Sequence, residues 1–277
     1  MIVDAHHHLW TADYPWLSDA ALQAIRRDYT VSDLRAHLGA AGVHRTVLVE
    51  AALCEDVETT RMLALAQQTP EIAAVVGWAS LSDPALPEKL AAHRAGPGGG
   101  LLAGIRDQVQ NYAAGDLDRP EVQKGLRHIA SAGLVNELVV RCDQLPAVAR
   151  AARALPESSF VLDHLGKPRI AAGSEGLDEW RERIQLVADC PNVVAKLSGL
   201  VTEADWNTWS VKDLAPFVET AMELFGEDRL MFGSDWPVCE LAATYEEVAE
   251  MFETLLGGRP AGVFGGTAVR VYRLEAE

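Results

Sequence analysis

Histidines open the chain in a pattern that suits chemistry. His6 and His8 stand one residue apart at the end of the apolar run Ile2–His6. Alternate residues of a strand point to the same side, so both imidazoles can face one centre. That arrangement suits a divalent metal ion, or a paired proton donor and acceptor; a surface histidine run without function is the alternative. We expect His7 to point away from this centre and to pack or cap.

Two later residues complete the candidate set. Asp235 follows the last apolar run of the chain, where it can serve as a metal ligand or a general base. An Asp at that place also suits the N-cap of the next helix. His164 ends another run and, taken alone, could simply be hydrogen-bonded in place. Together with His6 and His8, the two residues favour a catalytic role.

A repeating framework must position these residues. Short unalternating apolar runs are typical of parallel strands that are buried on both faces. Eight such runs alternate with amphipathic stretches, namely Ile2–His6, Thr46–Glu50, Ala73–Trp78, Leu102–Arg106, Glu137–Arg141, Phe160–Asp163, Val193–Lys196 and Leu230–Gly233. Eight strand–helix units in 277 residues predict an α/β fold, one (β/α)8 TIM barrel that forms a single domain over residues 1–277. An open doubly wound sheet is the alternative.

Polar and ionisable residues gather where these runs end. In a (β/α)8 barrel the carboxyl ends of the strands form one rim, and active sites lie there. A barrel core needs no charged residue at this rim, so the coincidence predicts a site. Besides the histidines and Asp235, the residues concerned are Glu50, Arg106, Arg141, Lys167 and Trp236.

The composition limits the partners. The chain has 24 Lys and Arg against 40 Asp and Glu, a formal net charge of −16. Such an acidic chain repels phosphate backbones and anionic membrane surfaces, so we expect no nucleic acid and no membrane as partner. No apolar stretch reaches the roughly 18 residues of a membrane span, and no signal peptide is recognisable. The four cysteines form no CxxC pair, which predicts free thiols and a cytoplasmic protein.

Five motifs in register along the chain resemble a known family. The motifs are Asp4–Trp10, Gly104–Arg106, Asp163–Pro168, Lys196–Gly199 and Phe232–Pro237. They are similar to those of the amidohydrolase-related branch of the amidohydrolase superfamily, and more narrowly to its sugar lactonases of the L-fuconolactonase and L-rhamnonolactonase type. The resemblance runs from Asp4 to about Tyr272. It implies a (β/α)8 barrel that hydrolyses a cyclic ester, with a small-molecule lactone as its only expected partner.

The resemblance also bears on metals. The wider superfamily holds one or two metal ions, and the ligand positions kept here are His6, His8, His164 and Asp235. The fourth strand ends in Arg106 in place of a Lys or Glu ligand, and the fifth in Arg141-Cys142 in place of His. These departures argue against a bridged binuclear centre. The resemblance implies that no cofactor is required; a single zinc ion on His6, His8 and Asp235 is the alternative.

A mechanism follows from the residue types and this resemblance. Asp235 is the expected general base for water, and His164 orients that water or shares its proton. Arg106, or His6 with His8, stabilises the negative oxygen of the tetrahedral intermediate, because a guanidinium stays charged at all relevant pH. Asp235 then returns the proton to the leaving hydroxyl.

Four further residues are predicted to contact the substrate. Lys167 is expected to bind sugar hydroxyls, or else to pair with a surface carboxylate. Trp236 offers an apolar face to a sugar ring, or else packs in the core. Arg141 adds positive charge to the rim, and Glu50 either binds a hydroxyl or repels an acidic substrate.

Two other classes of function stay open at the level of sequence. A metal-dependent amidohydrolase or a non-oxidative decarboxylase on the same barrel needs a firmly held metal, because an amide is less reactive than a lactone. A non-catalytic sugar-binding protein would not need the retained histidines and Asp235. The sequence does not indicate an oligomeric state or the sugar.

Overall fold

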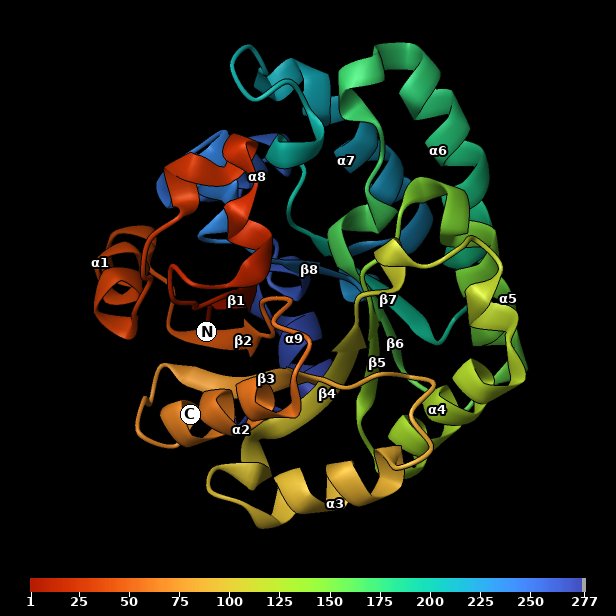
Figure 1. Ribbon diagram of the computed structural model, residues 1–277. Helices are drawn as coiled ribbons and strands as arrows, with labels where there is room; N and C mark the ends of the chain where they lie inside the picture. Colours follow the sequence, from red (N-terminus) through yellow and green to blue (C-terminus); the bar gives the residue numbers. More distant parts are fainter. Residues whose placement is uncertain (276–277) are drawn as a thin grey trace.

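Eight parallel strands follow one another around a barrel (Figure 1). This architecture is that of a computed structural model that describes residues 1–275. The strands are β1 Val3–His7, β2 Arg45–Val49, β3 Ile72–Trp78, β4 Leu102–Asp107, β5 Val135–Leu138, β6 Phe160–Leu162, β7 Val193–Leu197 and β8 Leu230–Phe232. Each strand pairs with the next one in the chain. This order confirms the predicted (β/α)8 barrel and excludes the doubly wound sheet, whose strand order reverses at a switch point.

Seven predicted strands agree with the structure to within one residue at each end, whereas the fifth is shifted. Its hydrogen-bonded ladder with β4 runs from Val135 to Leu138 and not from Glu137 to Arg141. The apolar pair Val139-Val140, which extended the predicted strand, belongs to the loop that follows β5. The inward-facing charged residue of this strand is therefore Glu137.

Main-chain hydrogen bonds close the barrel between its first and last strands. The Asp235 N–H donates to the His6 carbonyl at 2.8 Å, and the His8 N–H donates to the Trp236 carbonyl at 2.7 Å. The closure thus holds the backbone of His6 against Asp235, and that of His8 against the neighbouring Trp236.

An irregularity in β1 aims its histidines. The pairing with β2 advances by three residues on β1, from Asp4 to His7, against two on β2. Bulges of this kind re-aim side chains next to active sites. His6 and His8 face the rim of the barrel, while His7 lies on the other face with its Nε2 3.0 Å from Thr46 Oγ1. The prediction that His7 points away and packs is confirmed.

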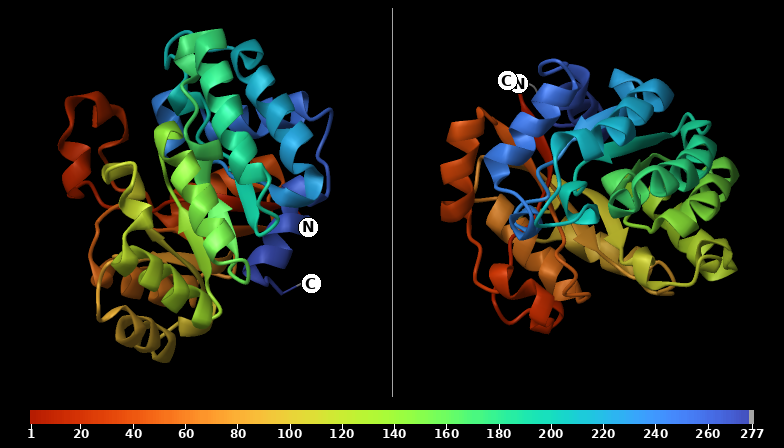
Figure 2. Two further views of the ribbon diagram at one scale, coloured as in Figure 1. Left: turned by 90° about the vertical axis from the view of Figure 1, so that its right-hand side faces the viewer. Right: turned by 90° about the horizontal axis from the view of Figure 1, so that it is seen from above.

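Helices surround the strands (Figure 2). They are α1 Val31–Ala41, α2 Asp56–Ala66, α3 Leu86–Ala95, α4 Pro120–Ser131, α5 Leu145–Ala154, α6 Gly173–Ala188, α7 Val211–Phe225, α8 Tyr245–Leu255 and α9 Thr267–Tyr272. The large apolar core lies between the strands and the outer helices. A smaller core of mainly Val and Ala fills the barrel, and Tyr272 of α9 joins it. The polar side chains described next lie above this inner core, at the carboxyl ends of the strands.

The four cysteines are free, as predicted, and only Cys54 is exposed. Within residues 1–275, no helix combines the length and the apolar character that a membrane crossing requires.

Candidate active site

Four predicted residues meet at the carboxyl end of the barrel. His6 Nε2 lies 3.6 Å from Asp235 Oδ1, and His8 Nε2 lies 3.5 Å from the same oxygen. His164 Nε2 is 3.9 Å from it. All four residues are at most 5% exposed. Residues that are far apart in the chain therefore surround one carboxylate, as the sequence predicted.

Unusual backbone conformations aim two of these side chains. Asp235 and His164 have φ values of 57° and 51°, in the left-handed region. Residues other than glycine rarely adopt this region, and such strain tends to occur at functional sites. The Ser198 Oγ lies 2.9 Å from His164 Nδ1 and fixes the imidazole plane. The turns after β6 and β8 thus direct an imidazole and a carboxylate toward each other.

Burial keeps two of the imidazoles beside Asp235 neutral. Burial is the largest cause that lowers the pKa of His6 well below its usual value, and the charge of Lys196 lowers it further. Burial also lowers the pKa of His164 to about 4, although Asp235 opposes this shift. For Asp235, burial raises the pKa, but the neighbouring His164 and His8 and the charge of Lys167 outweigh it, so the net shift is downward. At neutral pH the site therefore holds a carboxylate beside the uncharged rings of His6 and His164.

The hydrogen bonds fix which ring nitrogen carries each hydrogen. His8 Nδ1 lies 2.9 Å from the Val49 carbonyl, which only accepts, so Nδ1 is the donor and Nε2 keeps its lone pair. The Lys196 ammonium, which only donates, lies 3.0 Å from His6 Nδ1, and the Arg106 Nη1, which also only donates, lies 3.4 Å from His6 Nε2; the shorter contact favours a neutral ring with its hydrogen on Nε2. The 3.1 Å contact between the two Nε2 atoms is consistent with this assignment, because His6 donates and His8 accepts.

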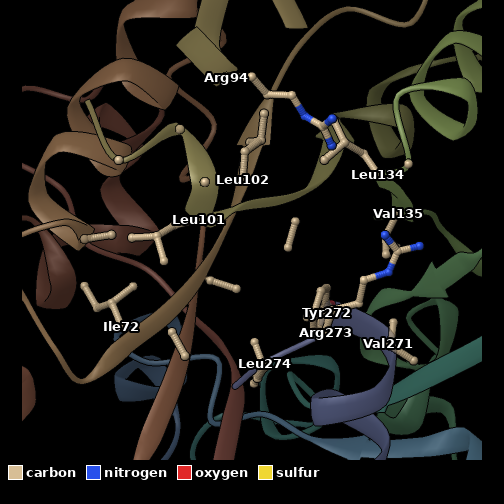
Figure 3. A pocket seen from close by; sticks show the side chains of 18 of the residues that line it. Ile72, Arg94, Leu101, Leu102, Leu134, Val135, Val271, Tyr272, Arg273 and Leu274 are labelled. Carbon is tan, nitrogen blue, oxygen red and sulfur yellow. The ribbon is translucent and has the colours of Figure 1, made fainter. Parts of the chain in front are cut away.

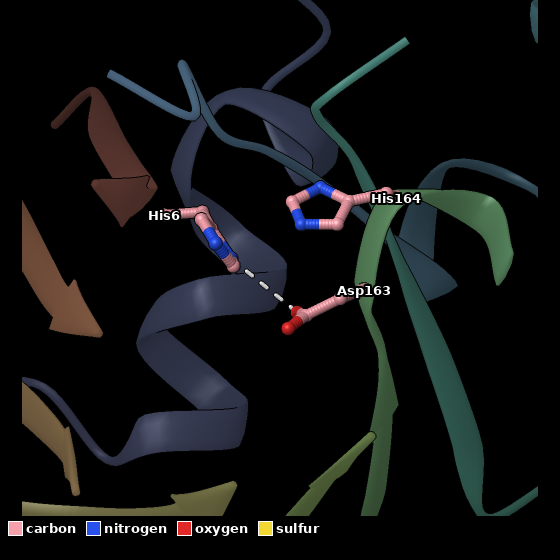
Figure 4. A group of neighbouring side chains, drawn as sticks. All are labelled: His6, Asp163 and His164. Carbon is pink, nitrogen blue, oxygen red and sulfur yellow. Dashed lines mark ion pairs between the residues drawn. The ribbon is translucent and has the colours of Figure 1, made fainter. Parts of the chain in front are cut away.

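Two groups of side chains have the chemistry and spacing of metal ligands. One consists of His6, His8 and Asp235, and the other of His6, Asp163 and His164 (Figure 4). In the first group the ligand atoms are 3.1 to 3.6 Å apart. Two ligands at about 2.0–2.2 Å from a tetrahedral zinc ion are about 3.4 Å apart. The first group therefore fits a single divalent cation.

Arg106 is brought to the site but is held by carboxyl groups. Its Nε lies 2.5 Å from Glu50 Oε1, its Nη1 2.9 Å from Asp163 Oδ2, and its Nη2 2.6 Å from the Glu50 carbonyl. Each guanidinium nitrogen thus already has an acceptor. Glu50 in turn accepts from the Gln108 side chain at 2.6 Å and from the Ala52 N–H at 2.7 Å. Arg106 and Glu50 thus form a buried ion pair beside the site, and Arg106 Nη1 also lies 3.4 Å from His6 Nε2.

Lys167 lies at the mouth of the site. Its ammonium is 3.7 Å from Glu203 Oε1, and both side chains are about one quarter exposed. Burial raises the pKa of Glu203, and the charge of Lys167 counteracts that shift. Glu203 follows β7 in a short helical turn that carries no recognisable motif, so no sequence pattern pointed to it. Both predicted readings of Lys167 are compatible with this geometry, since the pair is within reach of a ligand.

Arg141 and Trp236 are not brought to the site. The Arg141 side chain is 44% exposed and pairs with Asp143, because β5 ends three residues before it. Trp236 is fully buried; its ring lies against Tyr29 with ring centroids 5.2 Å apart. Its Nε1 donates to Glu240 at 2.8 Å. The left-handed turn at Asp235 directs the indole away from the rim, so Trp236 packs in the core.

A buried charged network below the histidines was not assigned from the sequence. The Lys196 ammonium lies 2.6 Å from Glu137 Oε1 and 3.2 Å from Asp163 Oδ1, and Tyr272 donates to Glu137 Oε2 at 2.5 Å. Burial raises the pKa of Glu137 to about 7. Burial tends to raise the pKa of Asp163. The charges of Lys196 and His6 outweigh burial and hold this pKa well below its usual value. One feature of the sequence indicated this network. Glu137 and Lys196 are charged residues in mostly apolar predicted strands.

A large cavity lies away from this site. It has a volume of about 1160 Å³ and opens at the amino-terminal ends of β2 to β6, where Arg94 and Arg273 point toward it (Figure 3). None of the histidines lines it, and neither does Asp235. Residue chemistry, and not cavity size, therefore locates the candidate active site.

An HxH pair on the first strand and an Asp after the eighth place the protein among amidohydrolase-type barrels. The chain belongs to the amidohydrolase family, because the Amidohydrolase family model matches residues 3–274. The L-fucono-1,5-lactonase of Burkholderia multivorans (strain ATCC 17616 / 249) is 37% identical over 289 residues, which cover 98% of this chain and 96% of that protein. The L-fucono-1,5-lactonase of Burkholderia ambifaria is 34% identical over 285 residues, 99% of this chain and 96% of that protein.

A solved structure is similar throughout. It is the crystal structure of an amidohydrolase from Burkholderia multivorans with bound Zn, with a TM-score of 0.93 and 37% sequence identity. The similarity covers 99% of this chain and 100% of that chain. The family resemblance predicted from the sequence is thus confirmed.

Proposed function

We propose that this protein hydrolyses a sugar lactone to the free sugar acid, and that a six-membered 1,5-lactone such as L-fucono-1,5-lactone is its substrate. The observation that carries the proposal is the buried Asp235 carboxylate, which is ringed by three imidazoles at 3.5 to 3.9 Å. Full-length similarity to two L-fucono-1,5-lactonases supports the choice of ring and sugar.

Asp235 acts as the general base in this proposal. A water molecule between Asp235 and His164 gives its proton to the carboxylate as its oxygen attacks the lactone carbonyl. A lactone is an activated ester, so a carboxylate of lowered pKa suffices for this step. Asp235 then passes the proton to the ring oxygen as the C–O bond breaks, and the products are a carboxylic acid and a hydroxyl on one chain.

The imidazoles orient the reactants. His6 Nε2–H, which donates to His8 in the free protein, turns to the oxygen on which negative charge develops when substrate binds, and such donors lower the barrier. His8, whose Nε2 is an acceptor, orients the water. Arg106 is held by Glu50 and Asp163, so in this proposal it contributes a fixed positive charge behind His6 and does not bind the intermediate directly.

Lys167 and Glu203 bind substrate hydroxyls at the mouth. A separation of 3.7 Å is longer than a good hydrogen bond, so a hydroxyl can accept from one side chain and donate to the other.

Free thiols support the predicted cytoplasmic location, where reducing conditions prevail.

We further propose that a divalent metal is optional. His6, His8 and Asp235 would hold it, since their ligand atoms have the required spacing. A bound zinc ion would polarise the carbonyl and lower the pKa of water. The related amidohydrolase structure with bound Zn supports the site, while the ready hydrolysis of lactones supports turnover without metal.

The test is a proton-release assay with L-fucono-1,5-lactone and with 1,4-lactones, each measured above spontaneous hydrolysis, with and without a chelator. We expect turnover of the 1,5-lactone in both conditions. Asp235→Asn should lower kcat by about 10²- to 10⁴-fold, the usual contribution of a general base. Asp178→Asn, which changes an exposed Asp on α6, is the matched control and should retain full activity.

Other outcomes would overturn the proposal. Turnover of Asp235→Asn near the wild-type rate would remove the assigned base. Activity on amides that disappears with the chelator would indicate a metal-dependent amidohydrolase. Binding of lactones without turnover would indicate a sugar-binding protein.

A further inference from the structure

Lys196 contacts a candidate metal ligand from inside the barrel. Its side chain is fully buried; it donates to Glu137 Oε1 at 2.6 Å and contacts His6 Nδ1 at 3.0 Å, while Asp163 Oδ1 lies at ion-pair distance, 3.2 Å, without hydrogen-bond geometry. An ammonium has three N–H donors and no acceptor. Nδ1 of His6 must therefore be the acceptor in its contact with Lys196.

Metal binding demands the opposite arrangement on His6. A histidine that ligates through Nε2 carries its hydrogen on Nδ1 and donates it to an oxygen. His8 meets this requirement through the Val49 carbonyl at 2.9 Å. His6 does not, because its Nδ1 faces an ammonium that cannot accept.

A second partner for His6 Nδ1 is already in place. Asp163 Oδ1 lies 3.3 Å from it, as the dashed line in Figure 4 shows. Among the described residues, this buried oxygen has no hydrogen bond of good geometry. The acceptor that a metal-ligating His6 needs is therefore present, and it is not satisfied by another donor.

We propose that Lys196 and Asp163 compete for Nδ1 of His6, and that Lys196 thereby holds metal affinity down. In one state Lys196 donates to Nδ1, and the hydrogen of His6 sits on Nε2. In the other state the hydrogen moves from Nε2 to Nδ1 and is donated to Asp163. The bond from Lys196 is then lost, and the Nε2 lone pair becomes free for a divalent cation. The number of protons bound by the ring is the same in both states.

This competition makes Lys196 a positioning residue that acts through His6. It gives a physical reason why a site with well-spaced ligands can work without metal. The inference concerns the histidine tautomer and cation affinity, so it goes beyond lactone hydrolysis and does not depend on it.

The first test uses the wild-type chain. Nitrogen-15 NMR of the imidazoles, in metal-free protein, should show a protonated Nε2 and an unprotonated Nδ1 for His6. Titration with zinc should reverse the two. A metal-free spectrum with the hydrogen of His6 on Nδ1 would overturn the proposal, whatever the protein hydrolyses.

The second test measures zinc affinity by competition with a chromophoric chelator. Lys196→Met combined with Glu137→Gln removes the buried pair together, so no lone buried charge remains. We expect zinc to bind about 10- to 100-fold more tightly, the range over which partners of metal ligands change affinity. Asp163→Asn, which weakens the alternative acceptor, should bind zinc more weakly than the wild type.

Lys167→Met is the matched control for charge. Lys167 is also a cation near Asp235, but it does not contact His6. Its removal should tighten zinc binding much less than the Lys196 double variant does, and should leave the His6 spectrum unchanged. An equal gain in both variants would show that simple charge repulsion controls affinity. Unchanged affinity in a folded Lys196 double variant would also overturn the proposal.

Discussion

Gly199 offers a direct test of how closely the site is packed. It follows Ser198 after β7 and has a φ of +64°. A Cβ added there would lie 2.4 Å from His164 Nδ1 and 3.0 Å from Asp235 Oδ2. A Gly199→Ala substitution therefore pushes directly on the proposed base and on its neighbour.

The size of the effect follows from these distances. Ordinary van der Waals contact begins near 3.4 Å, so the His164 ring must move by roughly 1 Å relative to the new Cβ. Such a shift breaks its 2.9 Å contact with Ser198. Misplacement of a reacting group by about 1 Å can cost about 10²-fold in rate. We expect kcat/KM for the lactone to fall by about that factor.

Stability changes for a separate reason. A non-glycine residue in the left-handed region costs roughly 1–2 kcal/mol, independent of any clash. Gly257→Ala isolates this cost, because Gly257 has a φ of +66° and its added Cβ would meet nothing within 4 Å. We expect Gly257→Ala to lower the free energy of unfolding and to keep full activity.

The assay is lactone hydrolysis on both variants, beside urea unfolding. If Gly199→Ala keeps kcat/KM within threefold of the wild type, the spacing between His164 and Asp235 does not govern catalysis. If Gly257→Ala loses as much activity as Gly199→Ala, backbone strain and not displacement of His164 is responsible.

Three other predictions concern buried and surface charges. Burial, with the charge of Glu50, raises the pKa of Glu58 from 4.5 to about 7. The folded state then keeps a proton that the unfolded chain loses, so the free energy of unfolding falls by about 3 kcal/mol as pH rises from 4.5 to 7. Urea unfolding of Glu58→Gln at several pH values should lack this part of the pH dependence. An unchanged pH dependence would contradict the assignment. Lys196→Met alone should lower the free energy of unfolding by about 3–5 kcal/mol, because it leaves Glu137 buried without a cation; chemical denaturation measures the loss, and a loss below 1 kcal/mol would count against the ion pair. Arg141→Ala should leave kcat/KM within twofold of the wild type, since its side chain pairs with Asp143 on the surface. A tenfold loss would show that Arg141 contributes to the site after all.

The barrel and the position of its rim were predictable because they depend on local patterns. Apolar runs bounded by polar residues mark buried parallel strands, and strand ends meet at one rim whatever the rest of the sequence does. His6, His8, His164 and Asp235 stand at such ends, so their meeting followed from chain topology alone. The fifth strand failed because its apolar run continues into a loop, and apolar character does not show where the pairing stops.

The partners of the charged residues were not predictable, because they depend on contacts between distant segments. Arg106 looks available in the sequence, yet Glu50 and Asp163 occupy its donors. Trp236 looks like a ligand platform, yet the left-handed backbone at Asp235 turns it into the core. The periodicity of apolar residues does not reveal a left-handed backbone conformation. It also does not reveal ion-pair partners that lie 56 and 57 residues away in the chain, as those of Arg106 do.

The pairing of charges supports the proposal that Asp235 is the general base. Glu50, Glu137 and Asp163 are each matched by a buried cation, Arg106 or Lys196, within 3.2 Å. Among residues 1–275, Asp235 has only imidazoles within ion-pair distance, and burial keeps those of His6 and His164 neutral. It is therefore the buried rim carboxylate whose lone pairs remain open to a proton from water. The negative charge of Asp235, which no buried cation matches, also favours turnover. A neutral lactone enters without repulsion. The product carboxylate forms beside Asp235 and is repelled toward Lys167 at the mouth of the site.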